Sequence, residues 1–174
     1  MLVEAAIIMP LLLLLVFGII EYGLLYKDTS TVSAAAASGA RTASTQARTS
    51  GYEVNAAAAV SGALSASGAT PQQLIIYRVE RNGSNQPVNW SNTQITGCTA
   101  CYKFTWDTTN KRWNTPTGTW LWSAQQACGS TLLTDYVGVW VQARHGMITG
   151  MFGSARTITE KTVMPLEPVR QPCS

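Results

Sequence analysis

The stretch LVEAAIIMPLLLLLVFGIIEYGLLY, from Leu2 to Tyr26, decides the fold of this chain. Within it, residues 5–20 carry no charged side chain. A helix over residues 2–26 would be roughly 37 Å long, which is enough to cross a hydrocarbon core of about 30 Å. We therefore predict a membrane-spanning helix at this end of the chain.

Two simpler interpretations of the apolar stretch fit it less well. A signal peptide has a basic start and an apolar core of about 7–15 residues, whereas here the core is longer and an acid stands at each end. An ordinary membrane anchor explains the length but not Glu4, because a carboxylate in hydrocarbon costs a few kcal/mol. From the residues alone, Glu4 can equally be a helix-end charge that the helix dipole favours.

The composition excludes several classes of protein. The chain has 174 residues, 46% of them hydrophobic and 12% charged, so it is not a disordered polar chain. Its net charge is +3, and no basic cluster is longer than Lys111-Arg112. This argues against a nucleic-acid-binding protein, which needs a basic surface. His145 is the only histidine, which is few for a metal-dependent hydrolase or a histidine-based enzyme.

Beyond Lys27-Asp28 the chain becomes rich in Ala, Ser and Thr. We predict one helix from Leu2 to about Arg48, with Arg41 and Arg48 on one solvated face, and a second, Ala-rich helix over 52–67. An Asn82-Gly83 pair predicts a hairpin turn. Alternating segments predict strands near 74–80, 101–106, 135–144 and 156–164. The fold class is therefore α+β: a spine helix (1–48), followed by a domain (49–174) with a small antiparallel sheet tied by disulfides.

The four cysteines have three possible roles. Cys98 and Cys101 form a C-x-x-C, which alone can be half of a zinc site or a redox pair. Cys128 and Cys173 are spaced poorly for zinc, and no βαβ unit surrounds the motif. We expect structural disulfides, Cys101–Cys128 and Cys98–Cys173. The first would close a Trp-rich excursion near 98–128 and stabilise the fold by roughly 3–4 kcal/mol.

Other residue sets suggest ligand binding or catalysis, but weakly. The tryptophans can stack on a ligand, although packing in the core is the simpler role; they are Trp90, Trp106, Trp113, Trp120, Trp122 and Trp140. Asp135, His145 and Ser154 have the residue types of a triad, but no nucleophile elbow surrounds a serine. Asn82 and Asn89 begin glycosylation sequons, a weak signal. We predict no enzyme, no cofactor and no metal.

The apolar stretch resembles the N-terminal signature of the TadE-like family of pilin-like proteins. That signature has an LVE start, an early proline, a glycine and an E-aromatic-G. The residues that match it are Glu4, Ala5, Pro10, Gly18, Glu21, Tyr22 and Gly23. SAAAASGARTAS (33–44) is similar to the small-residue helix of the family, and residues 148–168 resemble its closing strands.

The resemblance implies a pilin-like subunit, inserted in the membrane and then polymerised into an extracellular pilus. Its partners would be copies of itself, other pilins, a prepilin-type peptidase and the pilus assembly machinery. Glu4 would pair with the N-terminal amine of a neighbour. Pro10 would kink or locally melt the helix, and Gly18 and Gly23 would let helices approach.

Glu21, at the far end of the apolar run, is expected near the membrane surface. Its replacement by Ala should be milder than that of Glu4, unless it pairs with Lys27 or Arg41 of a neighbour. The competing hypothesis for the whole chain is a monomeric, membrane-anchored binding module with a Trp-rich ligand site.

Overall fold

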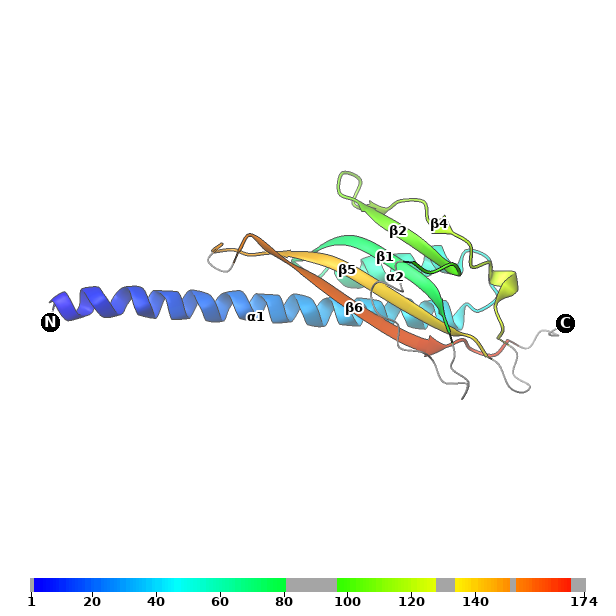
Figure 1. The fold of residues 1–174 in the computed structure, drawn as a ribbon, viewed down its shortest axis with the longest axis horizontal. Coiled ribbons are helices and arrows are strands. Elements are labelled where there is room, and N and C mark those ends of the chain that lie inside the picture. Colours follow the sequence, from blue (N-terminus) through cyan, green and yellow to red (C-terminus); the bar gives the residue numbers. More distant parts are fainter. Residues whose placement is uncertain (1, 81–96, 128–133, 151–152, 170–174) are drawn as a thin grey trace.

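The computed structural model describes residues 2–80, 97–127, 134–150 and 153–169, with side chains from residue 7 onward. A single long helix, α1 (Leu2–Thr45), runs the length of the molecule, and a shorter helix, α2 (Tyr52–Leu64), packs beside its second half. Figure 1 shows the first half of α1 projecting away from the rest of the chain.

The strands form one antiparallel sheet in the order β3-β2-β1-β5-β6, with β4 also paired to β2. Their bounds are β1 (Thr70–Val79), β2 (Cys101–Asp107), β3 (Arg112–Trp113), β4 (Thr117–Gly118), β5 (Tyr136–Gly146) and β6 (Ala155–Pro165). A short 3₁₀ turn, η1 (Trp122–Ala124), follows β4. The longest strands, β5 and β6, pair from Tyr136↔Pro165 to Gly146↔Ala155 and extend along α1 toward its N-terminal half (Figure 1).

The second half of α1 belongs to the core because its side chains are small. The residues of this half that are buried with α2 and the sheet are Val32, Ala35, Ala36, Ala40 and Ala43, and Ala47, just beyond the end of α1, is buried with them. Gly39 lies at the closest approach to α2, since a Cβ there would come within 2.5 Å of Val60 Cγ2. Small residues let two helices pack with little space between their backbones, as the Ala-rich composition predicts.

The sheet buries both of its faces over β1 and β5. Val137, Val139 and Val141 face the helices, as the alternation of residues 135–144 predicts. On the other face, Trp140 packs with Ile75 and Tyr77. Tyr77 lies opposite Gly138 in the register, and a Cβ on Gly138 would meet its ring at 2.2 Å. Burial raises the pKa of Tyr77 to about 12.

The predicted fold class is confirmed: a long apolar helix, a second helix and an antiparallel sheet. Two details of the first helix differ from the prediction. The helix continues through Pro10, so of the two predicted effects, a kink or local melting, the second is absent. It ends at Thr45, not Arg48, because Arg48 adopts a left-handed backbone (φ 57°).

Arg48 is half-buried and hydrogen-bonded within the chain, whereas its spacing with Arg41 predicts a solvated side chain. Its backbone N–H donates to Gln125 Oε1 at 2.7 Å, and its Nη1 donates to Gln125 O at 3.1 Å. Gln125 is buried, so these bonds satisfy polar atoms that would otherwise lack partners. Arg41, within the helix, is exposed as predicted.

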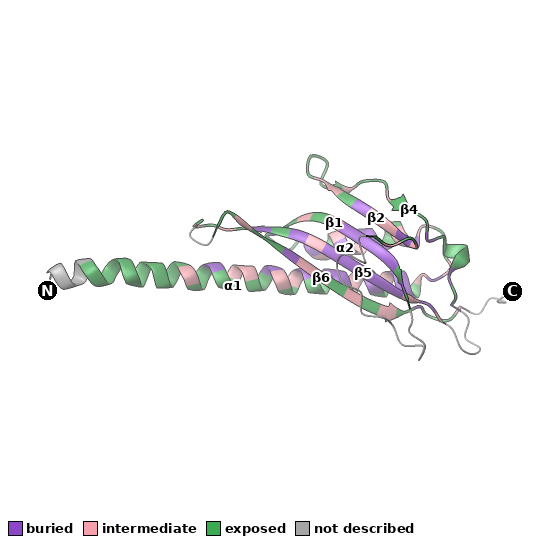
Figure 2. Ribbon diagram, viewed as in Figure 1, coloured by how far each residue is buried: buried purple, intermediate pink, exposed green. Residues whose placement is uncertain are grey.

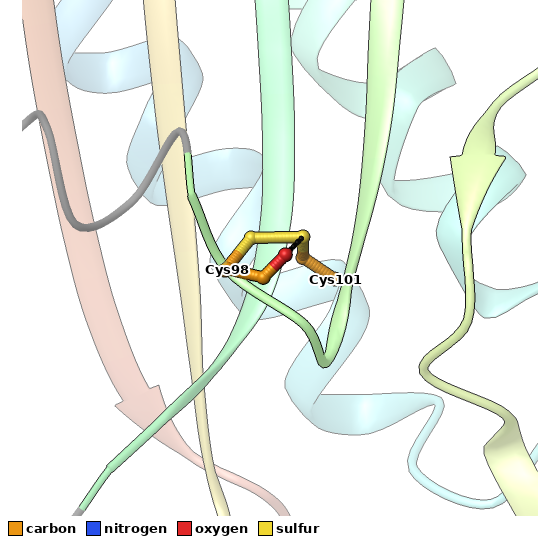
Figure 3. Close-up of a disulfide and its surroundings, with 2 residues drawn as sticks. All are labelled: Cys98 and Cys101. Atoms are coloured by element: carbon orange, nitrogen blue, oxygen red, sulfur yellow. Dashed lines mark hydrogen bonds between the residues drawn. A yellow bond between two sulfur atoms is a disulfide. The ribbon is translucent and has the colours of Figure 1, made fainter.

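The predicted disulfide pairing is wrong. Cys98 and Cys101 are joined to each other, with Cα atoms 6.0 Å apart, at the start of β2 (Figure 3). Neither is therefore available to Cys128 or Cys173, which lie outside the described residues. A bond across three residues closes so short a loop that the chain-entropy model gives it about 2 kcal/mol, less than the long loop we expected. Asn82, Asn89 and Trp90 also lie outside the described residues.

Candidate assembly site along the first helix

The first half of α1 exposes a continuous apolar surface. From Ile7 to Ile20, the large apolar side chains have exposed fractions between 44% (Phe17) and 71% (Ile7). Figure 2 shows this half exposed nearly all round, whereas the half beneath the sheet carries the buried positions. By length and composition, α1 is also the one helix among the described residues that is suited to crossing a membrane. Large exposed apolar surfaces of this kind mark a membrane or a protein interface.

Glu21 ends this apolar surface and is fully engaged within the chain. Its side chain is only 2% exposed. Glu21 Oε1 accepts the backbone N–H of Ile148 at 2.7 Å, and Oε2 accepts the N–H and the hydroxyl of Thr149 at 3.2 and 3.1 Å. These donors belong to the loop that follows β5. The carboxylate therefore holds the tip of the β5–β6 hairpin against α1 at the point where the apolar run stops.

Asp28, two turns further along α1, makes a second tie to the sheet. Its Oδ2 lies 2.7 Å from His145 Nδ1, and its Oδ1 accepts the N–H of Gly68 at 2.9 Å and the hydroxyl of Ser67 at 3.2 Å. Burial alone would raise the pKa of Asp28, but the hydrogen bonds from His145, Gly68 and Ser67 outweigh it and lower this pKa below its ordinary value. The carboxylate thus joins α1, β5 and the segment before β1.

A third tie lies near the C-terminal end of α1. The Ser44 hydroxyl donates to Pro165 O at 2.6 Å, and Glu167 N–H donates to Ser44 O at 3.0 Å. Glu21, Asp28 and Ser44 therefore fasten α1 to the sheet at successive points along its length. The sheet domain cannot swing freely about the helix, so α1 and the sheet form one rigid unit from Glu21 onward.

The residues predicted to act in assembly do not converge on one site within the chain. Glu4 lies in the first turn of α1, and Pro10 is exposed on its apolar half. Gly18 is half-buried, while Gly23 is exposed and has nothing within 4 Å of the position a Cβ would take. Glu21 is hydrogen-bonded to another part of the chain, the loop that follows β5. The open space at Gly23 leaves room for a neighbouring helix to approach.

The tryptophans do not form one exposed platform. Trp120 is buried on the helix side of the sheet, Trp140 is buried on the other side, and Trp106 and Trp113 pack edge to face with ring centres 4.9 Å apart. Two open hollows, of about 710 and 530 Å³, are bordered by α2 together with Trp106 and with Trp113 respectively. Packing, the simpler role, therefore accounts for at least two of the six tryptophans, Trp120 and Trp140.

Asp135 lies far from the other two residues of the weak triad. Ser154 is near His145, since Met147 N–H, two residues after His145, donates to Ser154 O at 3.1 Å. Asp135 precedes β5, and His145 lies ten residues later on the same strand, roughly 33 Å away at the rise of a strand. Asp135 binds Arg78 at 3.0 Å and Gln126 N–H at 2.9 Å. His145 binds Asp28 instead. These residues stabilise the fold in separate places and do not assemble a catalytic group.

The ties made by Asp28 and His145 were missed at the level of sequence, and so was the role of Glu21. One signal was present. Glu21 and Asp28 are seven residues apart, so they lie on one face of the helix, and the buried Val32 and Ala35 continue that face. When isolated acids lie on the same helix face as small or apolar residues, that face is packed against another element. The acids on it are then buried and need hydrogen-bond partners.

Comparison with known proteins agrees with the N-terminal resemblance. A family model described as TadE-like protein matches residues 1–41, which supports the assignment to the TadE-like family of pilin-like proteins. The match covers both halves of α1, including Glu4, Glu21 and Asp28. It does not extend to residues 148–168, whose resemblance to the closing strands stays a prediction. No curated protein and no solved structure matches the chain. The apolar helix and the family match together indicate a membrane-anchored, pilus-associated protein.

Proposed function

We propose that this chain is a structural pilin-like subunit that waits in the membrane and then polymerises into an extracellular pilus. The observation that carries the proposal is the exposed apolar half of α1, where the large apolar side chains from Ile7 to Ile20 are left uncovered by the part of the chain that the structure describes. Lipid covers this surface before assembly, and the helices of neighbouring subunits cover it afterwards. Both environments are apolar, so transfer between them costs little hydrophobic free energy.

In this proposal residues 1–48 form the spine of the filament, and residues 49–174 form its outer, extracytoplasmic part. The ties at Glu21 and Asp28 support it, because a sheet fixed rigidly to the spine gives every subunit the same outline. The partners are copies of this chain, other pilins, a prepilin-type peptidase and the assembly machinery. A regular helical filament requires such repeated, identical contacts.

Glu4 is the residue to which we assign the strongest role in assembly. Its carboxylate pairs with the N-terminal amine of a neighbouring subunit, so that neither charge stays unpaired in an apolar core. Pro10 shapes the helix near this contact by removing one backbone donor. Gly18 and Gly23 allow neighbouring helices to approach closely.

The test is to shear cells that produce Glu4→Ala or Glu4→Gln and to examine the released material by electron microscopy. We expect both variants to stay folded and membrane-inserted, yet to yield about 100-fold fewer filaments, since an unpaired buried charge costs about 3 kcal/mol or more per subunit. Normal filament yield from Glu4→Ala would show that Glu4 is only a helix-end charge.

The competing function is a monomeric surface module that binds a ligand through its tryptophans. The hollows beside Trp106 and Trp113 are the places where such a ligand would sit. Under this hypothesis the unmodified chain, like the Glu4 variants, gives no filaments when the cells are sheared. Filaments containing the unmodified chain would reject it.

A further inference from the structure

The tip of the β5–β6 hairpin combines a fixed backbone with an exposed apolar side chain. Ile148 N–H is held by Glu21 at 2.7 Å, and Met147 N–H donates to Ser154 O at 3.1 Å across the hairpin. Yet the Ile148 side chain is 71% exposed, more than any other large apolar side chain among the described residues outside α1. Its backbone is thus anchored, while its side chain points away from the protein.

This side chain lies level with the end of the apolar run of α1, because Glu21 sets its position. From Leu2 to Glu21 the helix rises roughly 28 Å, close to the hydrocarbon thickness of about 30 Å. If residues 2–20 cross the hydrocarbon, Ile148 therefore reaches the membrane surface. Figure 1 shows the hairpin reaching along α1 toward this level, ahead of every other part of the sheet.

The residues around the tip have the chemistry of a membrane interface. Tyr22 and Tyr26 are exposed on α1, and such aromatic residues are common at the level of lipid headgroups. The end of the hairpin carries exposed Arg144 and Arg156. The acids nearby are Glu21 and Asp28, and both are buried in the ties described above. Among the described residues, the exposed charge of this end is therefore positive, which suits the phosphate groups of lipid headgroups.

We propose that Ile148, after the end of β5, together with its basic margin, the exposed Arg144 and Arg156, is a second membrane contact that rests on the lipid surface entered by α1. This inference depends on the proposed membrane insertion of α1. With α1 and the hairpin both in contact with lipid, and with Glu21 joining them, the sheet domain has one orientation on the membrane. A second copy of the chain that met this tip with its own tip would bring two basic margins together, which lipid does not.

The experiment places a photo-crosslinking benzoylphenylalanine at one position of the full-length chain. Replacement of Ile148 keeps the backbone N–H that Glu21 accepts, so the hairpin is retained. Leu15, in the apolar half of α1, reports insertion itself. Leu121, which is 56% exposed at the opposite end of the sheet domain, is the matched control. Each protein is reconstituted in vesicles of phosphatidylethanolamine and phosphatidylglycerol, irradiated, and analysed by mass spectrometry.

We expect lipid adducts at Leu15 and Ile148, with a yield at Ile148 about tenfold above that at Leu121. Lipid adducts at Leu15 with none at Ile148 would overturn this inference and leave the proposed membrane insertion standing. Adducts between two copies of the chain at Ile148, without lipid adducts, would also overturn it and identify a subunit interface. Absence of lipid adducts at Leu15 would reject the insertion and the hairpin contact together.

Discussion

The two halves of α1 share one backbone but have opposite surroundings. The first half carries large apolar side chains that stay exposed, whereas the second half carries alanines and glycine that are buried. In a soluble protein we would expect the reverse, since large apolar residues contribute most to a core. The side chains of the second half are small because α2 and the sheet must pack closely on it. The first half is large and apolar because its partner lies outside the chain.

Glycine distinguishes the two halves most directly. We expect Gly39→Leu to lower the free energy of unfolding by about 3 kcal/mol, because the new side chain meets Val60 in a packed interface. Gly23→Leu should leave this stability unchanged, since nothing lies within 4 Å. Both changes raise helix propensity equally, so the difference between the two variants in the free energy of unfolding reports packing alone. Denaturant unfolding in detergent, followed by tryptophan fluorescence, measures it.

In assembly, Gly23→Leu should be the harmful change of the two. Gly23→Leu is expected to reduce filament yield while the subunit stays folded, because a neighbouring helix can no longer approach. Equal stability losses for the two variants would mean that the first half of α1 is packed within the chain, and the contrast between the halves would fail.

The tie at Asp28 should have the next largest effect. Asp28→Ala leaves His145 and the Gly68 N–H without their buried acceptor, and we expect a loss of about 2 kcal/mol in the free energy of unfolding. A double-mutant cycle with His145→Ala measures the coupling between the two side chains. Additive effects would show that the contact of 2.7 Å does not stabilise the fold.

The tie at Glu21 should act locally. Glu21→Ala removes the acceptor for the amides of Ile148 and Thr149, so we expect these to exchange hydrogen about tenfold faster. The amide of Val139, in the middle of β5, serves as the internal control and should not change. If Ile148 and Val139 respond alike, the effect is global, and the hairpin tip is not a separately held element.

The smallest effect expected is one of pH. Because the folded-state pKa of Asp28 is lowered, its contribution to stability is present above the unfolded pKa, about 3.9, and is lost as the pH falls through the lower folded value. Unfolding measurements from about pH 5 downward should show this decline. The free energy of unfolding of Asp28→Asn should depend less on pH. Subtracting the two pH profiles removes the contribution of the other carboxylates, which titrate in both proteins. Identical pH dependences for the original chain and Asp28→Asn would contradict the lowered folded-state pKa of Asp28.

The sequence alone determined the features that depend on local pattern. Residues 2–26 have the length and composition of a membrane helix, and the alternation of residues 135–144 correctly divides Val137, Val139 and Val141 from Trp140. The alanines of residues 33–47 indicated a helix that packs closely. Each of these properties follows from the period of a helix or strand and from side-chain size, which are readable along the chain.

Only the tertiary structure decided which distant residues meet. Four cysteines allow three pairings, and the observed Cys98–Cys101 bond depends on the turn that leads into β2. Glu21 reaches residues 148 and 149, and Asp28 reaches His145, across more than a hundred residues of chain. These contacts depend on how far β5 and β6 extend along α1, a geometry set by the packing of the sheet on the helix. A buried acid requires a partner, but the sequence does not state which donor the fold will bring to it.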